Sequence, residues 1–272
     1  MANTLNFASE TQTPDNHHTA QSVWCFRNDP WVYYQTYVKN NLEKPSVIRH
    51  QTDMLYKYEL LLGSSSFDEK FDQNAPINPS TKKPYGDDTQ KFAEWSKMVK
   101  HDGKIPVHPS SANAAHTAFQ WAVSQMEDGF ARTLGGILAP GGKSGLQETA
   151  LIDSSYCYAH VDHVTNDGRV CAVRMVRSLD HIKETEFCNE LAFTVAFWRT
   201  VLSESTVRHN LRDIAYAIMA EYDSPYRVAV FEVDLDKWTA EVFKSVHDLN
   251  QRFNSDSTSA WASPHHEPKE KI

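Results

Sequence analysis

The sequence predicts a mixed α/β fold, in which a central sheet is flanked by helices and preceded by a helical N-terminal region. Two observations predict it. Apolar residues recur at helical spacing through much of the first half of the chain, whereas from Leu146 they recur at every second position, as in half-buried strands. A long helical pattern, a further strand and a final helix follow, which gives the order β-β-β-α-β-α.

The first half of the chain is expected to be mostly helical. It opens with the aromatic-rich segment SVWCFRNDPWVYYQTYVKNNL, residues 22–42, where Asp29-Pro30 marks a turn or a helix start. Residues 52–63 show helical spacing and end in Gly63, a usual helix stop. After a long loop containing Pro and Gly, two more helices are expected, at 91–104 and 111–126.

The second half is expected to form the sheet and the helices that cover it. Strands are predicted within 147–164, at 169–178 and at 226–234, and the turn Thr165-Asn166-Asp167-Gly168 joins the first two of these regions. Helical patterns lie at 184–205 and 239–253.

Length and composition indicate one cytoplasmic domain. The chain has 272 residues, of which 40% are hydrophobic, enough to bury a substantial core. It lacks an apolar run of membrane-spanning length and a secretory signal pattern. The net charge of −8 argues against a broad grip on DNA. The expected organisation is a flexible arm at 1–20, a single domain at 21–253 with a helical part (21–145) and a sheet core (146–253), and a flexible tail at 254–272.

Several motifs occur in an order that suggests a known family. LLLGSSSFDEKF (60–71), FAEW (92–95) and SANAAHTAF (111–119) lead to Gln147-Glu148, and then to the two strands around Asp162. In this order and spacing the chain resembles the exonuclease VIII (RecE-type) branch of the PD-(D/E)XK nucleases, which is common in phages and related to lambda exonuclease. The resemblance implies a restriction-endonuclease-like PD-(D/E)XK core.

The catalytic positions of that family are degraded in this sequence. Mg²⁺ requires several oxygen ligands in octahedral array. Alanine stands in place of one acid, and arginine, which cannot accept a proton, stands in place of the lysine. The resemblance therefore implies no catalytic residue, no cofactor and no metal site, with Glu148 and Asp162 as weak candidates for metal binding. The vestigial positions are Tyr58 (His in the family), Glu148, Asp162, Ala172 (acid), Arg174 (lysine) and Thr194 (glutamine).

The favoured hypothesis is an inactive, exonuclease-like protein of a phage or mobile element, located in the bacterial cytoplasm. It would act by binding a host protein complex, as an inhibitor of a host nuclease or antiviral defence complex. Because members of the family are ring-shaped oligomers, the resemblance also implies a homo-oligomer.

Two alternatives remain open from the sequence. The first is an active Mg²⁺-dependent 5′-to-3′ double-strand DNA exonuclease, which would need a further acid, such as Asp153 or Asp180, beside Asp162 and Glu148. The second is a non-catalytic DNA-end binder whose affinity falls steeply with salt. Its candidate phosphate contacts are Arg169, Arg174, Arg177 and Lys183.

Overall fold

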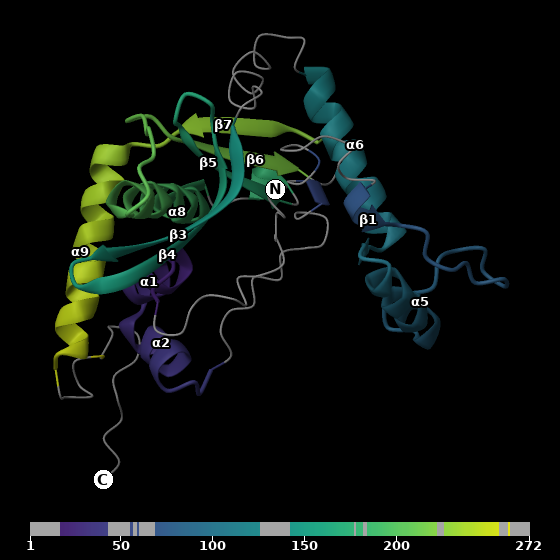
Figure 1. Ribbon diagram of the computed structural model, residues 1–272, viewed down its shortest axis with the longest axis horizontal. Coiled ribbons are helices and arrows are strands. Elements are labelled where there is room, and N and C mark those ends of the chain that lie inside the picture. The colour runs from purple at the N-terminus through teal and green to yellow at the C-terminus, as the bar shows by residue number, and fades with distance from the viewer. Residues whose placement is uncertain are drawn as a thin grey trace.

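A five-stranded mixed sheet with helices against both faces forms the centre of the computed structural model (Figure 1). The structure describes residues 17–42, 55–56, 59, 69–125, 142–176, 178–181, 184–221, 226–255 and 261. In spatial order, the strands are β3 (Lys143–Ile152), β4 (Ser155–Val164), β5 (Val170–Val176), β6 (Tyr216–Glu221) and β7 (Val228–Glu232).

The connections make the sheet mixed, as the sequence predicts. β3, β4 and β5 are antiparallel neighbours, and β7 runs antiparallel to β6. β5 and β6 are parallel, so the chain must cross over between them, and α8 (Glu184–Glu204) makes this crossover.

One face of the sheet is covered by three helices that are distant in the sequence. These are α8, α1 (Ala20–Asn28) and α9 (Leu235–Phe253), and Figure 1 shows α8 and α9 beside the β3–β4 hairpin. Trp24, Phe193 and Trp238, one from each helix, meet in the main core. Short helical segments follow α1, namely α2 (Pro30–Tyr33) and the π-helical turn η2 (Tyr34–Val38).

The other face packs against the helical region that precedes the sheet. Leu55, Tyr56 and Val107 join Val173 and Ile218 of the sheet in a second apolar cluster. Figure 1 shows α5, α6 and β1 together to one side of the main sheet. This region contains β1 (Phe71–Asp72), α5 (Gln90–His101), β2 (Ile105–Pro106) and α6 (Pro109–Gln125).

The fold extends beyond the expected limits of 21–253 at both ends. The backbone of His18 exchanges two 2.8 Å hydrogen bonds with Tyr156 and Tyr158 of β4, and Thr19 caps α1 in a reciprocal pair with Ser22. Trp261 is 4% exposed. These residues therefore belong to the folded unit, although they lie within the predicted arm and tail.

The expected order of elements is wrong at one strand. The order β-β-β-α-β-α omits β6, whose sequence YAIMAE shows no alternation because the strand is buried on both faces, with Ala217 and Met219 in the main core and Ile218 and Ala220 in the second cluster. The observed order from β3 onwards is β-β-β-α-β-β-α.

The four cysteines are free thiols, and two of them lie in the sheet. Burial raises the pKa of the Cys157 and Cys171 thiols to about 12, so both behave as apolar side chains. Within the described part of the chain, no helix is both long enough and apolar enough to cross a membrane.

Candidate functional site

Asp162 lies at the point where β4 and β5 separate. A turn closed by the bonds from Thr165 N to Arg169 O (2.9 Å) and from Gly168 N to Thr165 O (3.0 Å) brings the strands together, as the sequence predicts. The ladder then contains only the pairs His163–Cys171 and Val164–Val170.

Beyond the last pair of this ladder, the Asp162 carboxylate accepts a hydrogen bond from the backbone of β5. Its Oδ2 accepts a 2.9 Å hydrogen bond from the backbone N–H of Val173, and its side chain is 2% exposed. A buried backbone donor requires a partner, and here a carboxylate oxygen is that partner. Asp162 therefore holds β5 in place.

Arg174 supplies the charge opposite Asp162. Its Nη1 lies 3.7 Å from Asp162 Oδ2 and donates a 3.3 Å hydrogen bond to the carbonyl of Val173. The guanidinium is permanently charged, so it occupies the electrostatic role that a cation would otherwise have beside this buried acid.

Glu148, the second retained acid, has a different partner. Its Oε1 lies 3.3 Å from His209 Nε2, in the segment that follows α8. In the ladder Glu148 is opposite Ala159, three residues before Asp162 on β4, which is about 10 Å along a strand and on the alternate face. The two acids are thus engaged separately.

The other vestigial positions contain no metal ligand where the structure describes them. Ala172 is fully buried in the main core. The Thr194 hydroxyl donates a 2.9 Å hydrogen bond to the carbonyl of Glu190, one turn earlier in α8. Tyr58 lies outside the described residues.

The candidate phosphate contacts are only partly described. Arg169 Nη2 lies 2.8 Å from Asp167 Oδ2, and its guanidinium donates to the Tyr216 hydroxyl at 3.2 Å. A hydrogen bond from the Thr165 hydroxyl lowers the pKa of Asp167, which keeps this acid ionised beside Arg169. Arg174 pairs with Asp162, as described above, whereas Arg177 and Lys183 lie outside the described residues.

The acids that an active exonuclease would recruit lie elsewhere. Asp153, at the opposite end of β4, accepts from His247 (3.0 Å) and Asn250 of α9. Asp180 forms a bidentate pair with Arg227 at 2.9 and 2.8 Å. Among the described residues, no three His, Cys, Asp or Glu side chains are arranged to hold a metal ion.

Sequence reasoning missed two buried acids. Glu221 ends β6 and pairs with Arg227 at 2.6 Å, and Glu59, 1% exposed, lies 2.7 Å from His116 Nδ1 of α6. In the sequence, the apolar run before Glu221 is the available signal, because an acid that ends a buried strand requires a partner.

The overall fold is similar to that of a solved structure. A crystal structure of a candidate exonuclease from Eubacterium rectale aligns with a TM-score of 0.55 and 10% identity, over 93% of this chain and 85% of the other. The two chains therefore share a fold. At this identity the similarity concerns the fold alone.

The other comparisons found only a weak structural similarity and no related sequence. The structure of a protein named SSO0001 aligns with a TM-score of only 0.35 and 11% identity, over 90% of this chain and 80% of the other, which is too low to support an argument. No protein family profile matches the sequence, and no curated protein is significantly similar to it.

Proposed function

We propose that this chain is a catalytically inactive PD-(D/E)XK protein of the exonuclease VIII type, which acts by binding another protein. The observation that carries this proposal is the state of Asp162: the acid retained from the family's site bonds the Val173 N–H and faces Arg174. It serves as a structural anchor of the sheet.

The arrangement of elements around Asp162 supports the assignment to this family. Glu148 is on β3, Asp162 is near the end of β4, Ala172 and Arg174 are on β5, and Thr194 is in the crossover helix α8. These elements follow one another as the resemblance implies.

The residues at this site do not fit Mg²⁺. The ion needs converging oxygen ligands and keeps several waters. One oxygen of Asp162 accepts a bond from a backbone N–H, and a guanidinium lies close by. Glu148 Oε1 lies 3.3 Å from His209 Nε2, and the position of the third acid is the fully buried Ala172. These side chains therefore do not form a site for a hydrolytic Mg²⁺ ion.

The proposed partner is a protein complex of a bacterial host, and the proposed effect is inhibition of a nuclease or an antiviral defence complex in the bacterial cytoplasm. The net charge of −8 supports a protein partner over DNA, because binding to DNA depends on neutralising phosphates with Lys and Arg. A net negative charge also favours approach to the basic groove with which a DNA-binding enzyme holds its substrate.

A digestion assay tests the loss of catalysis. Linear duplex DNA is incubated with the full-length chain and Mg²⁺ or Mn²⁺, beside an Asp162→Ala variant and an active exonuclease as a positive control. We expect no degradation by either form of the chain. Degradation by the wild type that disappears in Asp162→Ala would show a working nuclease.

A binding assay tests the positive part of the proposal. The tagged full-length chain is used to isolate proteins from bacterial host cells, and the partner is then purified separately. Adding the chain should slow DNA degradation by that partner in proportion to complex formed. A partner that degrades DNA at an unchanged rate while bound would contradict inhibition.

A further inference from the structure

One edge of the central sheet is open, because β3 is the first strand in spatial order and, in the described part of the chain, pairs with β4 alone. On the other side of β4, the His18 N–H donates to Tyr156 O and the His18 carbonyl accepts from the Tyr158 N–H, both at 2.8 Å. Tyr156 and Tyr158 thus direct their backbone groups away from β3. In an antiparallel ladder their partners, Leu151 and Thr149, must therefore direct theirs away from β4.

Alternate residues of β3 present backbone donors and acceptors at this edge. They are Gln147, Thr149 and Leu151, because groups that point the same way recur at every second residue, about 7 Å apart. Among the described residues, no backbone hydrogen bond outside the β3–β4 ladder reaches these groups. A row of donors and acceptors with this spacing matches the backbone of another extended chain.

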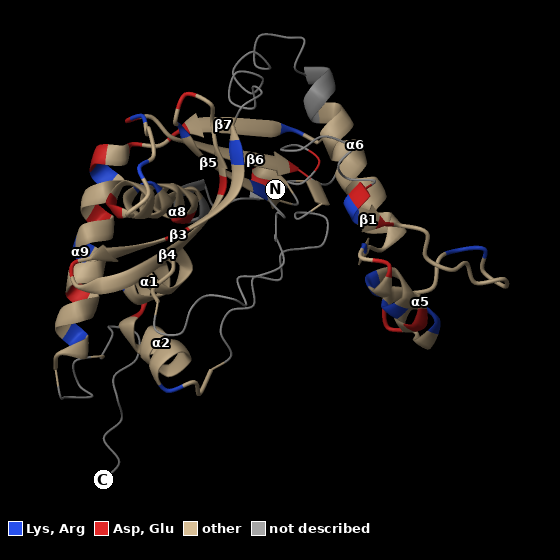
Figure 2. Ribbon diagram, in the orientation of Figure 1, with Lys and Arg blue, Asp and Glu red and all other residues tan. Residues whose placement is uncertain are grey.

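β3 lacks the features that protect exposed edges, which are shortness, lysine, proline or a bulge. It has 10 residues, more than the usual length of about five or six. Within 146–152 the only charged residue is Glu148, which pairs with His209, and Figure 2 shows few charged residues along the strand. The edge is therefore suited to accept a further strand.

An exposed apolar pair lies beside this edge. Leu151 and Tyr156 face each other across the ladder and are 57% and 58% exposed. Their side chains lie on the face of the sheet opposite α8, because Ala150 and Ile152, on either side of Leu151, point into the main core. An apolar side chain opposite Leu151 on an added strand would extend this pair and remove Leu151 from water.

A second copy of the chain matches the edge less well than a different protein does. Gln147, Thr149 and Leu151 can all pair with a copy only around a two-fold axis at Thr149. That arrangement places Gln147 opposite Leu151 twice, so that an amide meets the apolar side chain each time.

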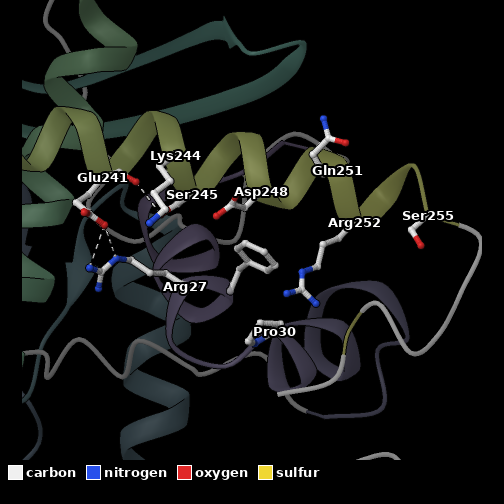
Figure 3. A pocket seen from close by; sticks show the side chains of 10 residues that line it. Arg27, Pro30, Glu241, Lys244, Ser245, Asp248, Gln251, Arg252 and Ser255 are labelled. Atoms are coloured by element: carbon white, nitrogen blue, oxygen red, sulfur yellow. Dashed lines mark hydrogen bonds and ion pairs between the residues drawn. The ribbon is translucent and has the colours of Figure 1, made fainter. Parts of the chain in front are cut away.

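A groove beside α9 is a separate surface of different character. It has a volume of about 830 Å³ and lies between α9 and the first two helices (Figure 3). Its Arg27 already bonds Glu241 at 3.1 Å and lies over the rings of Trp24 and Trp238. The exposed Lys244 of this groove provides a control position outside β3.

We propose that the open edge of β3 is the docking site for a protein partner, which adds an extended segment to the sheet and places an apolar side chain opposite Leu151. Backbone bonds to Gln147, Thr149 and Leu151 provide affinity, and the apolar contact provides selectivity. The inference rests on the proposed function for the existence of a natural partner, but peptide binding at this edge is measurable without one.

Residue-resolved amide hydrogen exchange of the full-length chain tests whether the edge is open. The amides of Gln147, Thr149 and Leu151 should exchange at least about tenfold faster than those of Glu148 and Ala150, which bond to β4. Equal protection of all these amides would overturn the proposal. Protection that appears only at high chain concentration would also overturn it, because a second copy would then occupy the edge.

A displayed library of random peptides of about eight residues is the probe for docking. Peptides selected by the full-length chain should carry apolar residues at alternate positions and should protect the amides of Gln147, Thr149 and Leu151. Methylating the peptide nitrogens that face β3 should raise the dissociation constant at least about tenfold, and methylating the other nitrogens should change it less than about threefold. Selection of no such peptide, or equal effects of both methylation patterns, would overturn the proposal.

Thr149→Pro removes an outward N–H and leaves the ladder with β4 intact, since proline is tolerated on the open side of an edge strand. It should weaken binding of a selected peptide at least about tenfold, as should Leu151→Lys, whereas Thr149→Val retains the N–H and should stay within about threefold of the wild type. Lys244→Ala is the control and should have no effect. Wild-type affinity in Thr149→Pro or Leu151→Lys, or an equal loss in Lys244→Ala, would contradict docking at β3. Circular dichroism confirms that each variant is folded, and Leu151→Lys keeps the test valid if proline disturbs the strand.

Inhibition of the host complex separates this inference from the proposed function. If Thr149→Pro and Leu151→Lys inhibit that complex as well as the wild type does, the proposed function stands and the docking site is wrong. If the edge binds peptides as expected but the wild type inhibits no host complex, the docking site stands and the proposed function is wrong.

Discussion

Glu221 is the acid whose charge contributes most clearly to the fold. Its side chain is fully buried at the end of β6. It accepts backbone N–H groups from Leu179 (2.7 Å) and Arg227 (2.8 Å), as well as the Arg227 guanidinium. These bonds, led by the guanidinium, lower the pKa of Glu221 to about 2. One carboxylate thus connects β6 to the segments that precede α8 and β7.

Replacing Glu221 by Gln should destabilise the protein by about 2 kcal/mol, because a charge-assisted network is lost, although partial exposure of Arg227 limits the effect. The stabilisation that Glu221 provides should decrease as the pH falls. Since the folded pKa is lower than the usual value of 4.5, the contribution is complete above about pH 5 and is lost as the pH falls towards 2. Urea unfolding at pH 7, 4 and 3 should show the gap between wild type and Glu221→Gln narrowing with acid, and a constant gap would contradict this.

Gly168 and Gly103 have similar backbone conformations but differ in the space available for a side chain. Both have positive φ (+91° and +79°), but a Cβ at Gly168 would lie 1.8 Å from the carbonyl oxygen of Asn210, whereas one at Gly103 would meet nothing within 4 Å. Gly103→Ala should cost about 1 kcal/mol from backbone strain. Gly168→Ala should cost at least about 3 kcal/mol because the turn between β4 and β5 must also move. Chemical denaturation measures the free energy of unfolding of both variants. Equal losses would contradict the close contact between position 168 and Asn210.

At the scale of elements, the sequence predicted the segments with a clear helical or alternating apolar pattern. The helices α5 and α9, each with one buried face, and the edge strand β7 are confirmed. The helix α8 is also confirmed; it is buried almost all round, and its length distinguishes it from a strand. β6 could not be found this way, since burial on both faces removes alternation. Asp162 could be singled out from the sequence, but its bond to Val173 depends on where β4 and β5 separate, which a period-two pattern does not encode.

The turn between β3 and β4 is another feature that the apolar pattern does not reveal. The run at 147–164 belongs to two strands, joined by a tight turn at Asp153 and Ser154, with φ of 44° and 69°. Such turns favour residues that tolerate positive φ, and Asp-Gly is a preferred pair. The sequence Asp-Ser is a weaker signal, so the position of the turn within 147–164 was not predicted.

Ser154→Gly should therefore stabilise the protein by about 0.5 kcal/mol, because it relieves strain at an exposed position and leaves Asp153 free to accept from His247. Differential scanning calorimetry measures the change in melting temperature. Ser80→Gly is the control, since Ser80 has a negative φ and should lose slight stability. A lower melting temperature for Ser154→Gly would contradict the relief of strain.

At the scale of the whole molecule, residues from both ends of the chain complete the core on the α1–α9 side. Trp261 stacks on Tyr34 (5.2 Å between ring centroids) and Tyr33 (5.9 Å), and packs edge-on against Phe26 and Phe253. His18 adds to the edge of β4. The folded unit therefore depends on residues that composition alone assigns to an arm and a tail.

Trp261→Ala should cost about 3 kcal/mol, as for other buried aromatic residues. Trp121→Ala provides the comparison, because Trp121 is 46% exposed and should cost less than about 1 kcal/mol. Urea unfolding of the full-length variants gives both values. If Trp261→Ala proved no worse than Trp121→Ala, residue 261 would not belong to the core.

The whole molecule shares its fold with a candidate exonuclease, and the proposal that this chain does not cut DNA depends on the contacts of Asp162. Titration of Mn²⁺ into the full-length chain, followed by electron paramagnetic resonance of the free ion, measures this most directly. With Asp162 held by Val173 and Arg174, we expect no saturable site with a dissociation constant below about 1 mM, and the same curve for Asp162→Ala. One stoichiometric Mn²⁺ site in the wild type that disappears in Asp162→Ala would contradict the account.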